Sequence, residues 1–165
     1  MIAGTPAGRP YDVSTLPATE FVNQVRLDVI NKAIETTQVP DATAVAADLG
    51  CTEAEVREAF RLLAEGHVYV LEPGDGGRLR MANPFSAVPT RFLVDAGGKR
   101  YFANCAWDAL GIVAVLGGTG TVRTSCPDCG EPLDIKVDSG RLAGAEGVVH
   151  FSVPAIHSWD DIVFT

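Results

Sequence analysis

Apolar residues recur at helical spacing through the first half of the chain. From residue 21 to residue 30 they lie one, three or four positions apart, which predicts an amphipathic helix that ends before Pro40. Asp41 is a suitable N-cap for a second helix over residues 42–49, and Gly50 is a suitable C-terminal stop. The first half of the chain is therefore expected to begin with two short helices.

A third helix and a hairpin are predicted next. Thr52 and Glu55 form a capping-box pattern at the start of an apolar-striped segment. The runs HVYVLEP (67–73) and GRLRMANP (77–84) alternate in polarity around a glycine-rich turn, which favours a β-hairpin. A helix, a helix–turn–helix and a hairpin are the elements of a winged helix, so we expect a winged-helix-like domain over residues 18–84.

The pattern changes near residue 84. Two strand-like runs flank a glycine turn at residues 96–98, and the apolar segment 106–116 predicts a largely buried helix. Three further alternating runs are expected to form strands: residues 120–125, 133–139 and 148–154. The fold class is thus α+β: a flexible arm (1–17), the winged-helix-like part (18–84), and a small mixed β-sheet domain with a buried helix (85–165).

Composition and charge narrow the function. The 165 residues include 13 Lys and Arg against 21 Asp and Glu, a net charge of −8, and residues 1–84 alone carry 7 basic and 12 acidic residues. DNA is therefore not an expected partner, because phosphate contacts require positive charge.

No apolar run is long enough to span a membrane and no signal peptide is evident, so we expect a cytoplasmic protein. Its four cysteines are then expected to be reduced, and either metal-binding or reactive.

Cys105 and Asp108 are the first candidates for chemistry. Cys105 lies between a predicted strand and a predicted helix, and the free N–H groups of a helix start favour a thiolate. Asp108 is three residues further on and shares a helix face with it. A soft sulfur beside a carboxylate suits binding of a thiophilic metal and transfer of a proton. The alternative is a packed cysteine beside a capping acid.

Cys126 and Cys129 are the second candidates. The sequence Cys-Pro-Asp-Cys-Gly is typical of a tight turn that directs two sulfurs to one metal. A structural zinc site requires four ligands, and Cys105, His150 or His157 could complete one in space. A turn with free thiols is the alternative. Cys51 is interpreted as a packed residue.

The segment at residues 100–137 resembles the core of the alkylmercury lyases. The resemblance rests on the aromatic-x-x-Cys-Ala-x-Asp-x-Leu stretch around Cys105, the buried helix that follows, and a cysteine-bearing turn succeeded by Gly-x-Pro. The acidic winged-helix-like half is also similar to the family, so the resemblance covers roughly residues 20–165.

The resemblance implies protonolysis of a carbon–mercury bond, which yields a hydrocarbon and Hg(II). Cys105 then corresponds to the first catalytic cysteine, Asp108 to the catalytic aspartate, and Cys126 to a cysteine regarded as structural, whereas Cys129 has no assigned role. The family's second catalytic cysteine lies further downstream, and this sequence has no cysteine after Cys129. Three explanations are open: the chain is truncated, another thiol replaces the second catalytic cysteine, or the lyase reaction is not performed. Cys129 is the only spare thiol for such a replacement.

The expected partner is an organomercurial or a soft metal ion. No cofactor is required; Hg(II) is product and ligand, and zinc is a further candidate at Cys126 and Cys129. Two other functions fit the same residues. One is a binding module for mercury, zinc or copper that holds metal through Cys105, Asp108, Cys126 and Cys129 without breaking bonds, and the other is a metal-responsive winged-helix regulator. The sequence does not specify the oligomeric state.

Overall fold

Three helices open the part of the chain that the computed structural model describes, which is residues 20–143, 148–151, 153–154 and 157–162. They are α1 (Glu20–Thr36), α2 (Ala42–Leu49) and α3 (Glu53–Glu65). Both predicted caps are confirmed. Asp41 accepts the backbone N–H of Ala44 at 2.8 Å, and Thr52 and Glu55 make the reciprocal hydrogen bonds of a capping box. The predicted arm at residues 1–17 lies outside the described residues.

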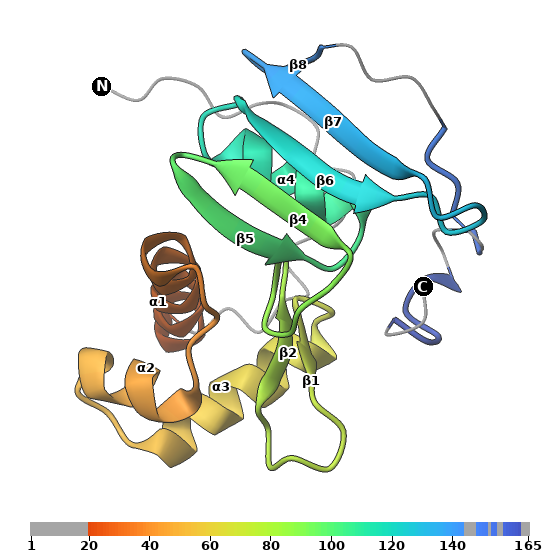
Figure 1. The fold of residues 1–165 in the computed structure, drawn as a ribbon. Helices are drawn as coiled ribbons and strands as arrows, with labels where there is room; N and C mark the ends of the chain where they lie inside the picture. The colour runs from red at the N-terminus through yellow and green to blue at the C-terminus, as the bar shows by residue number, and fades with distance from the viewer. Residues whose placement is uncertain (1–19, 144–147, 152, 155–156, 163–165) are drawn as a thin grey trace, which may run out of the picture.

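The strands of the described chain form one eight-stranded sheet (Figure 1). In chain order they are β1 (Tyr69–Leu71), β2 (Leu79–Ala82), β3 (Phe85–Ser86), β4 (Phe92–Ala96), β5 (Lys99–Ala103), β6 (Gly120–Ser125), β7 (Pro132–Asp138) and β8 (Arg141–Leu142). Their order across the sheet is β1-β2-β3-β5-β4-β6-β7-β8. The predicted hairpin of the first half therefore continues into the sheet of the second half.

The α+β class is confirmed, but the prediction of a mixed sheet is wrong, because all pairings among the described strands are antiparallel. Most neighbouring strands follow one another in the chain through short connections, which make antiparallel pairs. The one helical connection, α4 (Ala106–Val115), leads from β5 to β6. These two strands run in the same direction but are separated by β4, so they form no parallel ladder.

The prediction of a strand over residues 148–154 is also wrong. Residues 148–151 and 153–154 have no strand conformation, and Val148 is 92% exposed. The two-residue strand β8 instead pairs with β7 across the turn at Ser139 and Gly140. Alternating polarity marks a segment that suits a half-buried sheet, but it does not supply the neighbouring strand.

The buried apolar residues form two clusters. The first is built from α1, α2, α3 and the β1–β2 hairpin, and the second joins the central strands to α4, with Ala33 of α1 included. Two side chains of β5 tie the C-terminal end of α1 to the sheet. The Tyr101 hydroxyl donates to the Ile34 carbonyl at 3.0 Å, and the Lys99 ammonium donates to the Glu35 carbonyl at 2.7 Å. A cation at a helix C-terminus is favourable there.

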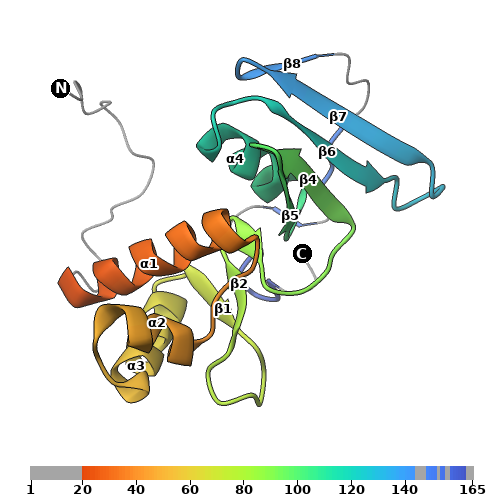
Figure 2. The ribbon, with the colours of Figure 1, turned by 60° about the vertical axis from the view of Figure 1, so that its left-hand side comes forward.

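Helix α4 lies against one face of the sheet (Figure 2). Ala109, Ile112 and Val113 are buried in the second cluster beside Val94 and Val122 of the sheet. This packing confirms the predicted buried helix and fixes the position of its first turn, where Cys105 and Asp108 lie. No helix among the described residues has the length and apolarity to cross a bilayer.

Replacing Gly120 with alanine is expected to lower the free energy of unfolding by about 1–3 kcal/mol, the usual range for an overpacked core. A Cβ at this position would lie 2.7 Å from the Asp95 carbonyl oxygen and 3.2 Å from Val113 Cγ2, so β6 could not keep its distance from α4. Denaturant titration measures the change. Gly111→Ala is the matched control, because its Cβ would make an ordinary 3.6 Å contact with Pro84. Equal stability of the two variants would contradict the packing described.

Candidate functional site

Cys105 is the N-cap residue of α4. It follows β5 by two residues and has an extended backbone conformation, with φ −147° and ψ −179°. Its Sγ accepts the backbone N–H of Asp108 at 3.5 Å and a second hydrogen bond from the backbone of Trp107. The side chain is half-buried, so it is neither sealed in the core nor fully in solvent. The predicted position at a strand-to-helix junction is thus confirmed.

The helix start favours the Cys105 thiolate as expected, since the backbone hydrogen bonds there lower the pKa of the thiol, but burial outweighs this effect. Burial raises the pKa of the Cys105 thiol, and the backbone hydrogen bonds from Asp108 and Trp107 only partly oppose it. The Asp108 carboxylate also raises this pKa, because a neighbouring negative charge disfavours the thiolate. Cys105 therefore keeps its proton at neutral pH until a base or a metal removes it.

Asp108 lies one helical turn from Cys105, and burial raises the pKa of its carboxyl group as well. Hydrogen bonds from Asn104 and from the Cys105 side chain oppose the rise. The Asn104 amide donates to Asp108 Oδ2 at 3.0 Å. Two protonatable groups that are both partly withdrawn from water and in contact can pass one proton between them.

Asn104 was not predicted as a functional residue. Its amide nitrogen also lies 3.3 Å from Asn83 Oδ1 and 3.5 Å from the Pro84 carbonyl oxygen, so it links the segment before β3 to the start of α4. Its Oδ1 is buried without a hydrogen-bond partner among the described residues. Asn104 therefore positions the Asp108 carboxylate. The only signal in the sequence was a polar residue directly before Cys105.

The two other candidate cysteines lie on the turn between β6 and β7. Cys126 is half-buried and Cys129 is exposed. Hydrogen bonds from the backbone of Cys129 and Asp128, and from the Cys129 side chain, hold the pKa of the Cys126 thiol below its usual value. The structure thus brings these two sulfurs together, as the spacing predicted.

The four candidate ligands do not form a single cluster. Among the described residues, no group of three or more His, Cys, Asp or Glu side chains is placed to hold a metal ion. Cys129 therefore does not join Cys105 and Asp108 as a third ligand. His157 pairs with Asp160 at 3.0 Å, and Cys51 packs against the first hydrophobic cluster, as predicted.

Two surface hollows lie away from Cys105 and Asp108. One, of about 580 Å³, is at the β4–β5 turn and is lined by residues such as Asp95 and Lys99. The other, of about 390 Å³, lies between the first turns of α1 and α3 and is lined by residues such as Phe21 and Leu62. Neither includes a cysteine, so neither is the reactive site.

The arginines of α3 and of the β1–β2 hairpin are all paired with acids. Glu53 pairs with Arg57, Glu58 and Glu65 with Arg61, Asp75 with Arg78, and Glu72 with Arg80. The segment that a winged helix would present to DNA thus has its positive charges neutralised internally. This arrangement offers little to a phosphate backbone.

The fold and site define an α+β protein with a cysteine–aspartate pair at the start of a buried helix. The model of the alkylmercury lyase family, MerB, matches residues 85–165, a range that includes Cys105, Asp108, Cys126 and Cys129. The crystal structure of the mercury-bound form of MerB2 is similar at a TM-score of 0.61 and 25% sequence identity, covering 79% of this chain and 61% of that chain. Residues 85–165 thus match the alkylmercury lyase family, and the fold of the chain is similar to that of MerB2.

The chain thus spans about three fifths of the length of MerB2, covering 61% of it. A comparison with the curated proteins gives no match.

Proposed function

We propose that this protein cleaves the carbon–mercury bond of organomercurials by protonolysis, with Cys105 and Asp108 as its reacting residues. The observation that carries the proposal is their contact across the first turn of α4, within the segment that matches the family. Sulfur is the preferred ligand of a soft metal such as mercury. A carboxyl group with a raised pKa is suited to hold a proton and release it.

The first step exchanges a proton for mercury. The Cys105 sulfur forms a bond to the mercury of R–Hg–X, the X⁻ ligand leaves, and the thiol proton passes to the Asp108 carboxylate. The short path between the two side chains allows this transfer, since they are hydrogen-bonded. The raised pKa of Asp108 favours its protonated form at this stage.

The second step breaks the carbon–mercury bond. Its electron pair takes the proton from Asp108 and becomes the new C–H bond, so that the hydrocarbon R–H leaves. Mercury stays on Cys105 as Hg(II), and Asp108 returns to the carboxylate. A second thiolate on mercury adds electron density to the metal and makes the carbon easier to protonate. A free thiol in solution can supply this ligand, and it can also remove Hg(II) afterwards.

The test is to offer phenylmercury to the full chain with an excess of free thiol and to measure benzene by gas chromatography. The proposal predicts more benzene than thiol alone produces, with repeated turnover. Stoichiometric uptake of intact phenylmercury without benzene would instead support a binding module.

Asn104→Ala is expected to move the acidic limb of the pH profile of benzene release to higher pH. Asn104 lowers the pKa of Asp108 through its hydrogen bond, so its removal lets burial raise that pKa further. The carboxylate that accepts the thiol proton then forms only at higher pH. Asn31→Ala, on the exposed side of α1, is the control and keeps the wild-type profile. A lower rate with an unmoved limb would show that Asn104 has only a structural role.

A further inference from the structure

The turn between β6 and β7 holds a second pair of sulfurs in a defined geometry. The base of the turn is closed by the pairing of Ser125 with Pro132, and the Cys126 N–H donates to the Glu131 carbonyl at 2.9 Å. The Gly130 N–H donates back to the Cys126 carbonyl at 2.9 Å, and Gly130 has the positive φ of 76° that the turn requires. The backbone of the turn is thus fixed before any ligand arrives.

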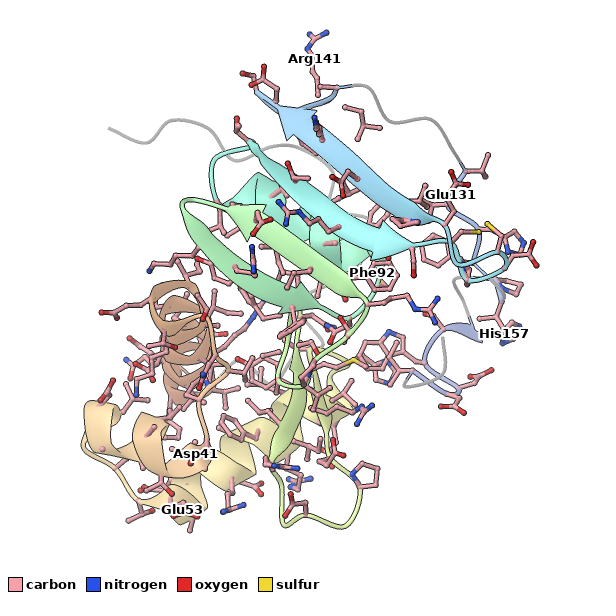
Figure 3. All side chains as sticks on the ribbon, in the orientation of Figure 1. Asp41, Glu53, Phe92, Glu131, Arg141 and His157 are labelled. Atoms are coloured by element: carbon pink, nitrogen blue, oxygen red, sulfur yellow. The ribbon has the colours of Figure 1, made fainter. Side chains whose placement is uncertain are left out.

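The two sulfurs share a hydrogen-bonded environment. The Cys126 sulfur accepts hydrogen bonds from the backbone N–H groups of Cys129 and Asp128. The side chain of Cys129 is also hydrogen-bonded to the Cys126 sulfur. Backbone N–H groups that converge on one atom form a concave site for negative charge. Figure 3 shows two sulfur atoms at this turn, beside the labelled Glu131. Cys129 is exposed, so a cation can reach the pair from solvent.

The donor set selects the kind of cation. Within the described part of the chain, no third His, Cys, Asp or Glu completes a metal-binding group at this turn. His157, a candidate ligand from the sequence, pairs with Asp160 at 3.0 Å. Zinc in a structural site takes four ligands in a tetrahedron, which two thiols do not provide. Two sulfurs without further ligands suit a soft cation that accepts two-fold coordination.

The pair is also at the same end of the sheet as Cys105. Ala103 of β5 is opposite Phe92 of β4, and the next residue of β4, Leu93, is opposite Arg123 of β6. Cys105 follows Ala103 by two residues, and Cys126 follows Arg123 by three. Both sulfur sites therefore lie beyond the same ends of β5 and β6.

We propose that Cys126 and Cys129 form a second site, separate from Cys105 and Asp108, which chelates one Hg(II) ion through both sulfurs. Binding releases the two thiol protons to solvent, and two sulfur–mercury bonds replace the bonds of the incoming ion to its previous ligands. Chelation itself needs no lyase reaction. The use of this site to receive the mercury that Cys105 releases rests on the proposed function.

The experiment loads the full chain with mercuric chloride, challenges it with excess glutathione, and measures retained mercury by native mass spectrometry. The wild type and Cys51→Ser are each expected to retain one mercury ion after the glutathione challenge. Cys126→Ser, Cys129→Ser and the double variant are each expected to lose it completely. A chelate needs both sulfurs, so each single substitution removes as much as the double one. Cys51→Ser is the matched control, a half-buried cysteine in the turn between α2 and α3.

Circular dichroism shows whether each variant is folded. Because serine replaces cysteine at an outer turn, we expect the spectra to coincide. Single variants that retain mercury as the wild type does, or a wild type that loses it all to glutathione, would overturn the proposal. Tighter retention of zinc than of mercury would also overturn it. Cys105→Ser is expected to keep this mercury, so failure of the lyase reaction and failure of the dithiol site give different results.

Discussion

Cys105→Ser is expected to abolish benzene formation from phenylmercury while the protein stays folded. The Cys105 sulfur is the atom proposed to bind mercury, and an oxygen at that position is a hard donor that binds a soft metal weakly. The backbone N–H of Asp108 donates a hydrogen bond to the Cys105 sulfur. Serine is a good N-cap residue, so its hydroxyl oxygen can accept this hydrogen bond in the variant. The melting temperature is therefore expected to change little.

Benzene is measured by gas chromatography in the presence of free thiol, and melting by circular dichroism. Cys51→Ser serves as the control again, because Cys51 packs against the first hydrophobic cluster. This substitution is expected to leave benzene formation unchanged. Benzene released by Cys105→Ser at the wild-type rate would contradict the assignment of Cys105.

Asp108→Asn is expected to lower the rate of benzene release by about 10²–10⁴-fold, the usual contribution of a positioned acid or base. The amide keeps the size of the side chain but cannot take the proton from Cys105 or return it to carbon. Mercury binding at Cys105 is expected to persist, so phenylmercury accumulates on the protein. Asp134→Asn, on the exposed part of β7, is the matched control and keeps the wild-type rate.

The same substitution is expected to stabilise the fold at neutral pH. The folded-state pKa of Asp108 is raised by burial, so the protonated form is favoured by folding. This contribution is complete below the ordinary pKa of the carboxyl group and is lost as the pH rises through the raised value. Asp108→Asn removes the ionisation, and its free energy of unfolding should exceed that of the wild type at neutral pH. The difference should shrink in acid, and a variant that is less stable at neutral pH would contradict the pKa direction.

Local features of the site and fold could be predicted from the sequence. The Asp41 cap and the Thr52–Glu55 capping box depend on residues three positions apart, and both are present. The contact between Cys105 and Asp108 across one helical turn is local in the same sense. The pairing of Cys126 with Cys129 likewise needs only the turn that their spacing allows.

Features that depend on the tertiary fold could not be predicted. The pKa of Cys105 is raised because α4 and its surroundings bury the sulfur, and no local pattern measures burial. Asn104 acts on Asp108 while also bonded to Asn83, which is 21 residues earlier in the chain. The segment around Val148 forms no strand because β8 is the segment that pairs with β7. Which segment pairs with β7 depends on the tertiary structure of the sheet and not on the local sequence.

The central claim is that Asp108 delivers to carbon a proton which it received from the Cys105 thiol. The most direct test is to react the wild-type protein with phenylmercury and excess thiol in deuterium oxide, where both exchangeable groups carry deuterium, and to analyse the benzene by mass spectrometry. We predict benzene that carries a single deuterium, at a rate that Asp108→Asn nearly abolishes. Phenylmercury that remains intact on the protein, or deuterated benzene formed equally fast by Asp108→Asn, would contradict it.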